Sequence, residues 1–385
     1  MSEYQYYEFT AVDQPLTARQ QSELRARSSR ATITCNSFIN EYNWGDLSGE
    51  PLEWMRHYFD AHVYSASWGH CLLMLKLPAS CLDQAMLDAC LQPAGSDVFE
   101  ASAAGQHCIL TWHFSDEEGE HDRFWTHEDG PGWLSRLLPL RQELLRGDTR
   151  PLYLGWLARL CAQELNDEDI EPPLPPGLAT LTPAQQALVE FLEIDPDWLQ
   201  AAAASSPTET THAAADHNVW LEQQSPAELR TTARLLLEGR TMEAESSLNR
   251  RFLDWHRQHS TQPAPSARRT LADIATGYAA AREQRLERER RAQAKAEARR
   301  LAERKKYLAG VAANADQIWQ EMDTELKQGS GRSYDRALEL AKSLAEALAQ
   351  AGRQKEFRQA LERLQQQHTR RPAWVTRLKK AGLLT

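Results

Sequence analysis

The densest group of side chains that could do chemistry lies between residues 107 and 129. It contains four histidines, seven carboxylates and one cysteine: His107, Cys108, His113, Asp116, Glu117, Glu118, Glu120, His121, Asp122, His127, Glu128 and Asp129. Imidazole and carboxylate groups bind divalent metals, and two histidines an even number of residues apart on a strand share a face. The short ligand spacing of known metal sites is nevertheless missing. We interpret the segment as an acidic surface loop, and a metal-dependent enzyme at His107–His127 stays an alternative.

Other catalytic patterns are missing from the sequence. It contains no GxSxG nucleophile motif, no GxxxxGK[ST] phosphate-binding loop and no GxGxxG motif. All 6 cysteines lie before residue 162, and none forms a CxxC pair, so we expect reduced thiols rather than disulfides or a zinc site. We predict a protein that is not an enzyme and holds no cofactor or metal.

A polar and aromatic stretch at residues 40–46, NEYNWGD, interrupts the periodicity around it. Aromatic side chains on loops are typical anchors of protein interfaces, so Tyr42, Trp44 and Asp46 are candidate partner-binding residues. The alternative is a structural loop with Trp44 in the core. The sequence leaves both open.

Charge is distributed unevenly along the chain. Residues 268–385 contain 26 Lys and Arg against 15 Asp and Glu, whereas residues 1–267 contain 18 against 39. The basic residues concentrate at 282–306, where 11 basic and 5 acidic side chains accompany only two large aliphatic ones, Leu286 and Leu301. A nucleic-acid-binding arm would use Arg288, Arg290, Arg291, Arg299, Arg300, Lys305 and Lys306. We favour a solvated helix instead. Opposite charges alternate at i,i+4, and the segment has no aromatic residue on which a base could stack.

The first 165 residues have the pattern of an α+β domain. Short runs rich in β-branched and aromatic residues predict strands, while residues 16–29 and 80–91 are helical in character, the second capped by Ser80. The predicted strands are residues 4–12, 61–67, 71–77, 97–103 and 107–114. We expect an antiparallel sheet with helices on one face.

An all-α region follows. Residues 178–258 form a helical domain whose helix starts are marked by a capping residue before proline, as in Thr182-Pro183 and Ser225-Pro226. Polar stretches at 166–177, 205–217 and 259–268 read as linkers.

The last two regions are a long charged helix, 269–328, and a helical-hairpin tail, 332–385. We expect one helix from 271 to 326, with a heptad seam after Leu301 that packs on the tail or on a second copy of the chain. Trp319, Tyr334, Phe357 and Trp374 are further candidate partner-binding residues.

Two resemblances add to these predictions. The start YYEFTAVDQPLT with NEYNWGDLSG resembles the opening of an uncharacterised bacterial family. The tail, with its hairpin spacing and the ending His368-Thr-Arg-Arg-Pro372, is similar to the carboxy-terminal region of bacterial SWIM zinc-finger proteins, although no cysteine follows Cys161 to supply the zinc motif. That resemblance implies the company of a DNA-handling ATPase or a SWIM-type protein.

Together these features predict a non-enzymatic interaction or adaptor protein of a bacterial multi-protein assembly. The amino terminus lacks a secretory signal and no apolar run is long enough to span a bilayer, so we expect a cytoplasmic protein without membrane contact. The alternative is a nucleic-acid-associated accessory factor that uses the basic helix.

Overall fold

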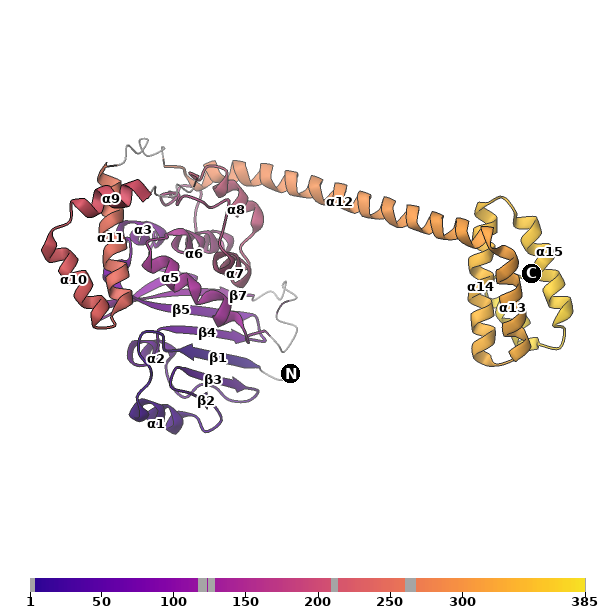
Figure 1. Ribbon diagram of the computed structural model, residues 1–385, viewed down its shortest axis with the longest axis horizontal. Coiled ribbons are helices and arrows are strands. Elements are labelled where there is room, and N and C mark those ends of the chain that lie inside the picture. The colour runs from indigo at the N-terminus through magenta and orange to yellow at the C-terminus, as the bar shows by residue number, and fades with distance from the viewer. Residues whose placement is uncertain (1–3, 117–122, 124–128, 209–213, 260–267, 385) are drawn as a thin grey trace. The chain divides into compact units, whose positions relative to one another are not determined.

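The computed structural model describes residues 4–116, 123, 129–208, 214–259 and 268–384. The chain divides into two compact units, Met1–Gln284 and Arg285–Thr385, which are described separately. In the first unit, an antiparallel sheet is followed by helices, and the second is helical (Figure 1). The prediction of an α+β fold followed by an all-α region is confirmed.

The sheet has seven strands in the order β2-β3-β1-β4-β5-β7-β6, and every pair is antiparallel. Its strands are β1 Gln5–Thr10, β2 Thr32–Ile33, β3 Ser37–Tyr42, β4 Ala61–Ala66, β5 His70–Pro78, β6 Phe99–Ala104 and β7 His107–Ser115. Gly105 and Gln106 form the two-residue turn between β6 and β7, and Gly105 adopts the positive φ of 65° that such a turn requires.

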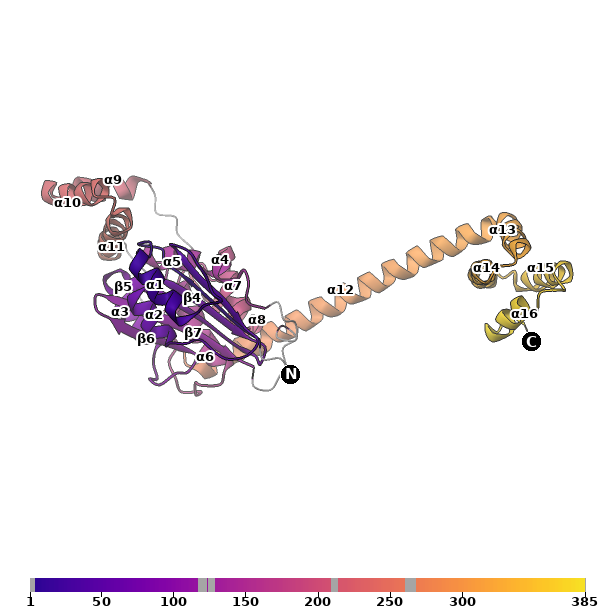
Figure 2. The same ribbon diagram turned by 90° about the horizontal axis from the view of Figure 1, so that it is seen from below.

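Helices cover both faces of the sheet rather than one (Figure 2). Val63, Leu73 and Trp112 point to a large core under helices that follow the strands in the chain. Phe9, Phe38 and Met74 point the other way, against α1 Ala18–Arg27 and α2 Pro51–His57. Successive side chains of a strand point to opposite faces, and the central strands carry apolar side chains on both faces. Each face of the sheet is therefore packed against helices. The helices of the larger layer are α3 Gln84–Cys90, α4 Trp133–Leu137, α5 Pro139–Leu145, α6 Arg150–Cys161, α7 Pro183–Phe191 and α8 Pro196–Ala203.

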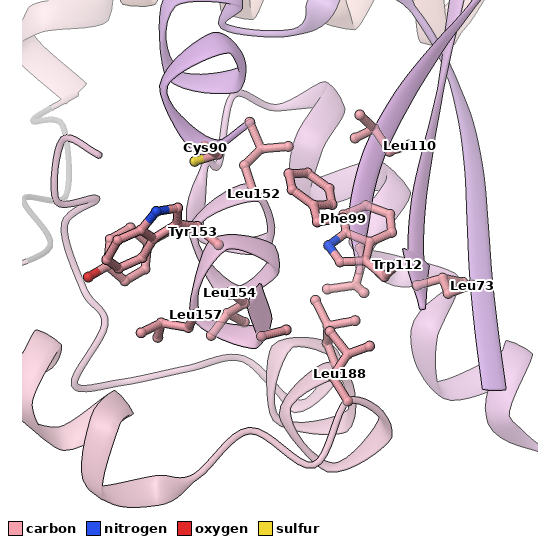
Figure 3. Packing of buried hydrophobic residues seen from close by; sticks show 14 of the residues in the cluster. Leu73, Cys90, Phe99, Leu110, Trp112, Leu152, Tyr153, Leu154, Leu157 and Leu188 are labelled. Carbon is pink, nitrogen blue, oxygen red and sulfur yellow. The ribbon is translucent and has the colours of Figure 1, made fainter. Parts of the chain in front are cut away.

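Helix α6 is buried on nearly every side and packs against the sheet (Figure 3). Its backbone approaches the sheet most closely at Gly155. A Cβ atom at this position would lie 2.7 Å from Cγ of Phe99 and 2.8 Å from Nε1 of Trp112. Both rings are fully buried, so neither has room to move away. Glycine is required here by the contact, because the helical backbone alone would prefer alanine.

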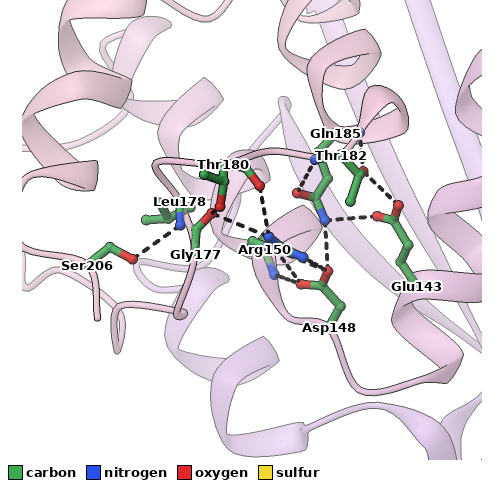
Figure 4. A network of polar contacts seen from close by, with 9 residues as sticks. All are labelled: Glu143, Asp148, Arg150, Gly177, Leu178, Thr180, Thr182, Gln185 and Ser206. Carbon is green, nitrogen blue, oxygen red and sulfur yellow. Dashed lines mark hydrogen bonds and ion pairs between the residues drawn. The ribbon is translucent and has the colours of Figure 1, made fainter. Parts of the chain in front are cut away.

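A buried polar network fastens α7 to the loops around it (Figure 4). The Gln185 amide donates to Oε2 of Glu143 at 2.9 Å and to Oδ2 of Asp148 at 2.8 Å, while its oxygen accepts from the backbone of Thr182. Arg150 pairs with Asp148 and donates to the carbonyls of Gly177 and Thr180. Burial raises the pKa of Glu143, and the bonds from Thr182 and Gln185 oppose that rise. The Thr182 cap predicted from sequence is therefore part of a larger network.

Three further helices complete the first unit: α9 Ala214–Glu222, α10 Pro226–Leu237 and α11 Thr241–His259. Trp220 and Phe252 meet edge to face at 5.5 Å, and Arg146 after α5 pairs with Glu245 on α11. The sequence placed residues 214–217 in a linker, but they begin α9. The start of this helix, Ala214-Ala215, lacks the proline that marks the starts of α8 and α10.

The second unit packs four helices and the end of α12 around one core. They are α12 Leu271–Ala313, α13 Ala315–Gln328, α14 Gly331–Gln350, α15 Gln354–Gln367 and α16 Pro372–Lys380. Leu308, Met322, Leu344, Leu361 and Trp374 are among the buried residues. The prediction of a single helix from 271 to 326 is wrong. The helix is interrupted at Asn314, where the chain turns, and α13 then packs against α14.

Two smaller findings concern helix ends and membranes. Asp83, not Ser80, caps α3, since its side chain accepts from the backbone of Met86 and residues 79–81 form a 3-10 turn. In the part of the chain that is described, no helix combines the length and the apolar character needed to cross a bilayer.

Candidate functional site

Several connections of the sheet converge at one end of it. Gln5 at the start of β1 pairs with Tyr42 at the end of β3 and with Ala66 at the end of β4. The loop after β3 and the β4–β5 turn at residues 67–69 therefore leave the same end of the sheet, on either side of β1. His70 pairs with Ser115, so β7 ends here as well. We refer to this region as the sheet end.

The loop after β3 is attached to β1 by side chains. Tyr7 donates from its hydroxyl to Oδ1 of Asp46 at 2.7 Å, and the Gln5 amide donates to the Gly45 carbonyl at 3.0 Å. Oδ1 of Asp46 also accepts from the backbone of Leu47. Burial and the bond to Asp46 raise the pKa of Tyr7, so its hydroxyl stays protonated and can donate. The loop therefore has a defined conformation.

Trp44 lies on this attached loop and points into solvent, with 76 % of its surface exposed. Gly45 follows Trp44 in the chain with a φ of 87°. The loop contacts β1 through Gly45 and Asp46, the two residues after Trp44. Trp68, in the β4–β5 turn at the same sheet end, is 42 % exposed. The alternative in which Trp44 packs in the core is wrong.

The other residues of the NEYNWGD stretch have structural roles. Asn40, Glu41 and Tyr42 belong to strand β3, not to a loop. Asn40 is buried and donates to the Ser28 hydroxyl, which explains how a polar residue fits this strand. Tyr42 is half-buried and meets Tyr7 edge to face at 5.8 Å. Of the three candidates in this stretch, Trp44 is the one that presents a large exposed apolar side chain.

A buried histidine that sequence reasoning missed lies in the sheet beside these residues. His62 on β4 has no exposed surface, stacks on Phe9 at 3.7 Å between ring centroids, and donates from Nδ1 to the carbonyl of Glu8. No partner reaches its Nε2 atom among the described residues. Burial lowers the pKa of His62 to about 3, so the ring is neutral at physiological pH. Because it is enclosed, it has no access to a substrate.

Asp129 anchors the opposite face of the sheet end. Its carboxylate accepts from the Ser65 hydroxyl at 2.6 Å, from Nε1 of Trp133 at 2.9 Å and from Nε of Arg123 at 3.0 Å. Burial alone would raise the pKa of Asp129, but the Arg123 guanidinium and these hydrogen bonds lower it overall. The group is an ion pair that joins the sheet to α4, and its hydrogen bonds to Ser65, Trp133 and Arg123 have a structural role.

The histidines expected to bind metal do not come together where they are described. His107 and His113 are six residues apart on β7, which separates them by about 20 Å along the strand. The imidazole of His113 lies instead beside His70, 5.6 Å between ring centroids. Within the described ranges, no three His, Cys, Asp or Glu side chains are grouped to hold an ion. Some members of the cluster lie outside the described residues: Glu117, Glu118, Glu120, His121, Asp122, His127 and Glu128.

Comparison with known proteins adds no further assignment. The chain matches no protein-family model, no curated protein and no solved structure. The resemblances of its start to a bacterial family and of its tail to SWIM proteins stay predictions.

The aromatic candidates of the tail lie in its own core. Tyr334, Phe357 and Trp374 are buried, and Trp319 is half-buried against Phe357 at 5.6 Å between ring centroids. Arg371 donates to the Tyr334 hydroxyl at 2.8 Å. These side chains hold the tail helices together and leave little surface for a partner.

The basic candidates have the opposite environment. Every side chain from residue 286 to residue 307 is exposed, which includes Arg288, Arg290, Arg291, Arg299, Arg300, Lys305 and Lys306. Helix α12 is therefore solvated over most of this range, and near its end Arg304 pairs with Glu346 on α14.

Proposed function

We propose that the protein is a non-enzymatic interaction protein that binds a partner protein through the sheet end. The observation that carries this proposal is the exposure of Trp44 on a loop held by Asp46 and Gly45. An exposed indole in water is unfavourable, and a loop of defined conformation loses little entropy when it binds.

The energetic argument is direct. A tryptophan side chain has roughly 250 Å² of surface, so covering the exposed three quarters of Trp44 would contribute about 5 kcal/mol at 25 cal/mol per Å² before the costs of association. Tryptophan residues are also over-represented among the few interface residues that dominate affinity. Trp68 offers a second, smaller anchor at the same sheet end.

The partner class follows from the resemblance of the tail. Similarity to SWIM proteins favours a bacterial assembly that contains a DNA-handling ATPase. The acidic balance of residues 1–267 favours a basic surface on the protein that covers the sheet end.

A photo-crosslinking amino acid at position 44 tests the proposal. Val12 is the matched control, because it is 39 % exposed and follows the opposite end of β1. In native lysate we expect a discrete crosslinked partner from position 44 and none from position 12. W44S should then reduce recovery of that partner at least tenfold, and V12S should not. The same products from both positions, or equal recovery by both variants, would overturn the proposal.

A further inference from the structure

The exposed part of α12 has an asymmetry that its composition conceals. Successive residues of an α-helix are rotated by about 100°, so residues three, four and seven apart share a side. Between residues 285 and 306, one half of the circumference carries Arg285, Arg288, Arg291, Lys295, Arg299 and Lys306. We call these six residues the basic stripe.

The remaining positions on this half are small. They are four alanines and one acidic residue: Ala292, Ala296, Ala298, Ala302 and Glu303. The opposite half mixes Arg290, Arg300, Arg304 and Lys305 with Glu287, Glu289 and Glu297, and it also carries the two leucines. Nearly all of the net positive charge of this segment therefore faces one way. All of it lies within the second unit.

Exposed ion pairs within the helix engage part of the basic stripe. Arg285 pairs with Glu289 at 3.0 Å, Arg291 with Glu287 at 2.7 Å and Arg299 with Glu303 at 3.7 Å. These pairs are exposed, so they are weak, screened by salt and readily exchanged for a stronger anion. Arginine guanidinium groups bind phosphate oxygens in two-point geometry, which adds strength and orientation to such a contact.

The shape of this face selects among polyanions. The stripe is about 32 Å long at 1.5 Å per residue, close to the 34 Å of one turn of B-form DNA. Because alanines separate the basic side chains, the helix is slender enough to enter a major groove about 12 Å wide. Aromatic residues for stacking on single strands are missing from residues 285–306, and no apolar face exists to enter a lipid surface.

We propose that the basic stripe binds the phosphate backbone of double-stranded DNA without regard to base sequence. The structure changes the set of residues expected from sequence. Arg290, Arg300 and Lys305 point to the other half of the helix, whereas Arg285 and Lys295 join the contact. This function is separate from the partner contact at Trp44, which lies in the first unit.

Two triple variants of the full-length protein test the proposal by fluorescence anisotropy with a 20-base-pair duplex. R288Q/K295Q/R299Q removes three charges from the stripe, and R290Q/R300Q/K305Q removes three from the opposite half. Net charge and helix propensity are therefore matched, and circular dichroism confirms helicity in both. For the wild type, six phosphate contacts predict a slope of about −5 in log affinity against log salt. The stripe variant should show a slope of about −3 and bind at least tenfold more weakly at 50 mM salt, with the control close to wild type.

Several outcomes would overturn the proposal. They are an absence of duplex binding at 50 mM salt, equal losses in the two triple variants, and tighter binding to a single strand than to a duplex. Stronger binding to duplex RNA than to duplex DNA also counts against it, because the narrow major groove of A-form RNA does not admit a helix. W44S separates this proposal from the partner contact, since it should leave DNA affinity unchanged whether or not the sheet end binds a protein.

Discussion

Replacement of His62 by phenylalanine should make the first unit markedly less sensitive to acid. In the folded protein His62 is enclosed and neutral, with its pKa lowered to about 3 by burial. In the unfolded chain a histidine has a pKa of about 6.5. Between these two values the unfolded state binds more protons, so the free energy of unfolding falls as pH decreases from 6.5 toward 3.

The size of the effect follows from the two pKa values. At pH 5 the unfolded state is almost fully protonated at this position and the folded state almost not at all. The difference costs about 2 kcal/mol of stability at pH 5, against less than about 0.2 kcal/mol at pH 7.5. Phenylalanine keeps a planar ring to stack on Phe9 but does not titrate. It also loses the hydrogen bond from Nδ1 to the Glu8 carbonyl, and this loss affects both pH values equally.

Urea unfolding at pH 7.5 and pH 5.0 measures the difference. Tryptophan fluorescence reports mainly on the first unit, which contains ten of the 12 tryptophans. The stability lost by the wild type between the two pH values should exceed the loss in H62F by about 2 kcal/mol. H57Q removes a histidine whose side chain is 66 % exposed and should behave as the wild type. Equal losses in the wild type and H62F would refute the reasoning.

Two further predictions concern packing and polar contacts. G155A should destabilise the first unit by about 1 to 3 kcal/mol, because the new Cβ overlaps the rings of Phe99 and Trp112, whereas G310A in open space on α12 should stabilise its helix by about 0.5 to 1 kcal/mol. Thermal unfolding checks both, and a gain in stability for G155A would contradict the packing argument. Q185L should cost about 2 to 3 kcal/mol in urea unfolding, because Glu143 and Asp148 lose their amide donor, while its exposed neighbour variant Q186L should cost less than about 1 kcal/mol. Equal costs for these two variants would contradict the role of the network.

Local signals in the sequence predicted much of this fold. The strands β4 to β7 and the helices that begin with a capping residue and proline were found because their signals lie within a few residues. Strand β3 was missed because Asn40 and Glu41 are polar, and Asn40 is accommodated only by the hydroxyl of Ser28, twelve residues away.

The sites were harder to predict because they depend on pairing across the sheet. His62 stacks on Phe9 only because β1 and β4 are neighbours in one register. Trp44 is exposed because Tyr7 and Gln5, some 40 residues away, hold the residues after it. The aromatic residues of the tail were predicted to bind a partner but lie in the core, because side chains such as Trp374 are as typical of a core as of an interface.

The solvated stretch of α12 also has a practical consequence for dissecting the molecule. From residue 286 to residue 303 the side chains of this helix are exposed and lie outside any tertiary core, so its turns can open locally without unfolding the packed helices on either side. Its amide protons should exchange far faster than those of α6. Its closely spaced arginines and lysines are sites for trypsin, so brief digestion should release two folded fragments that can be assayed separately.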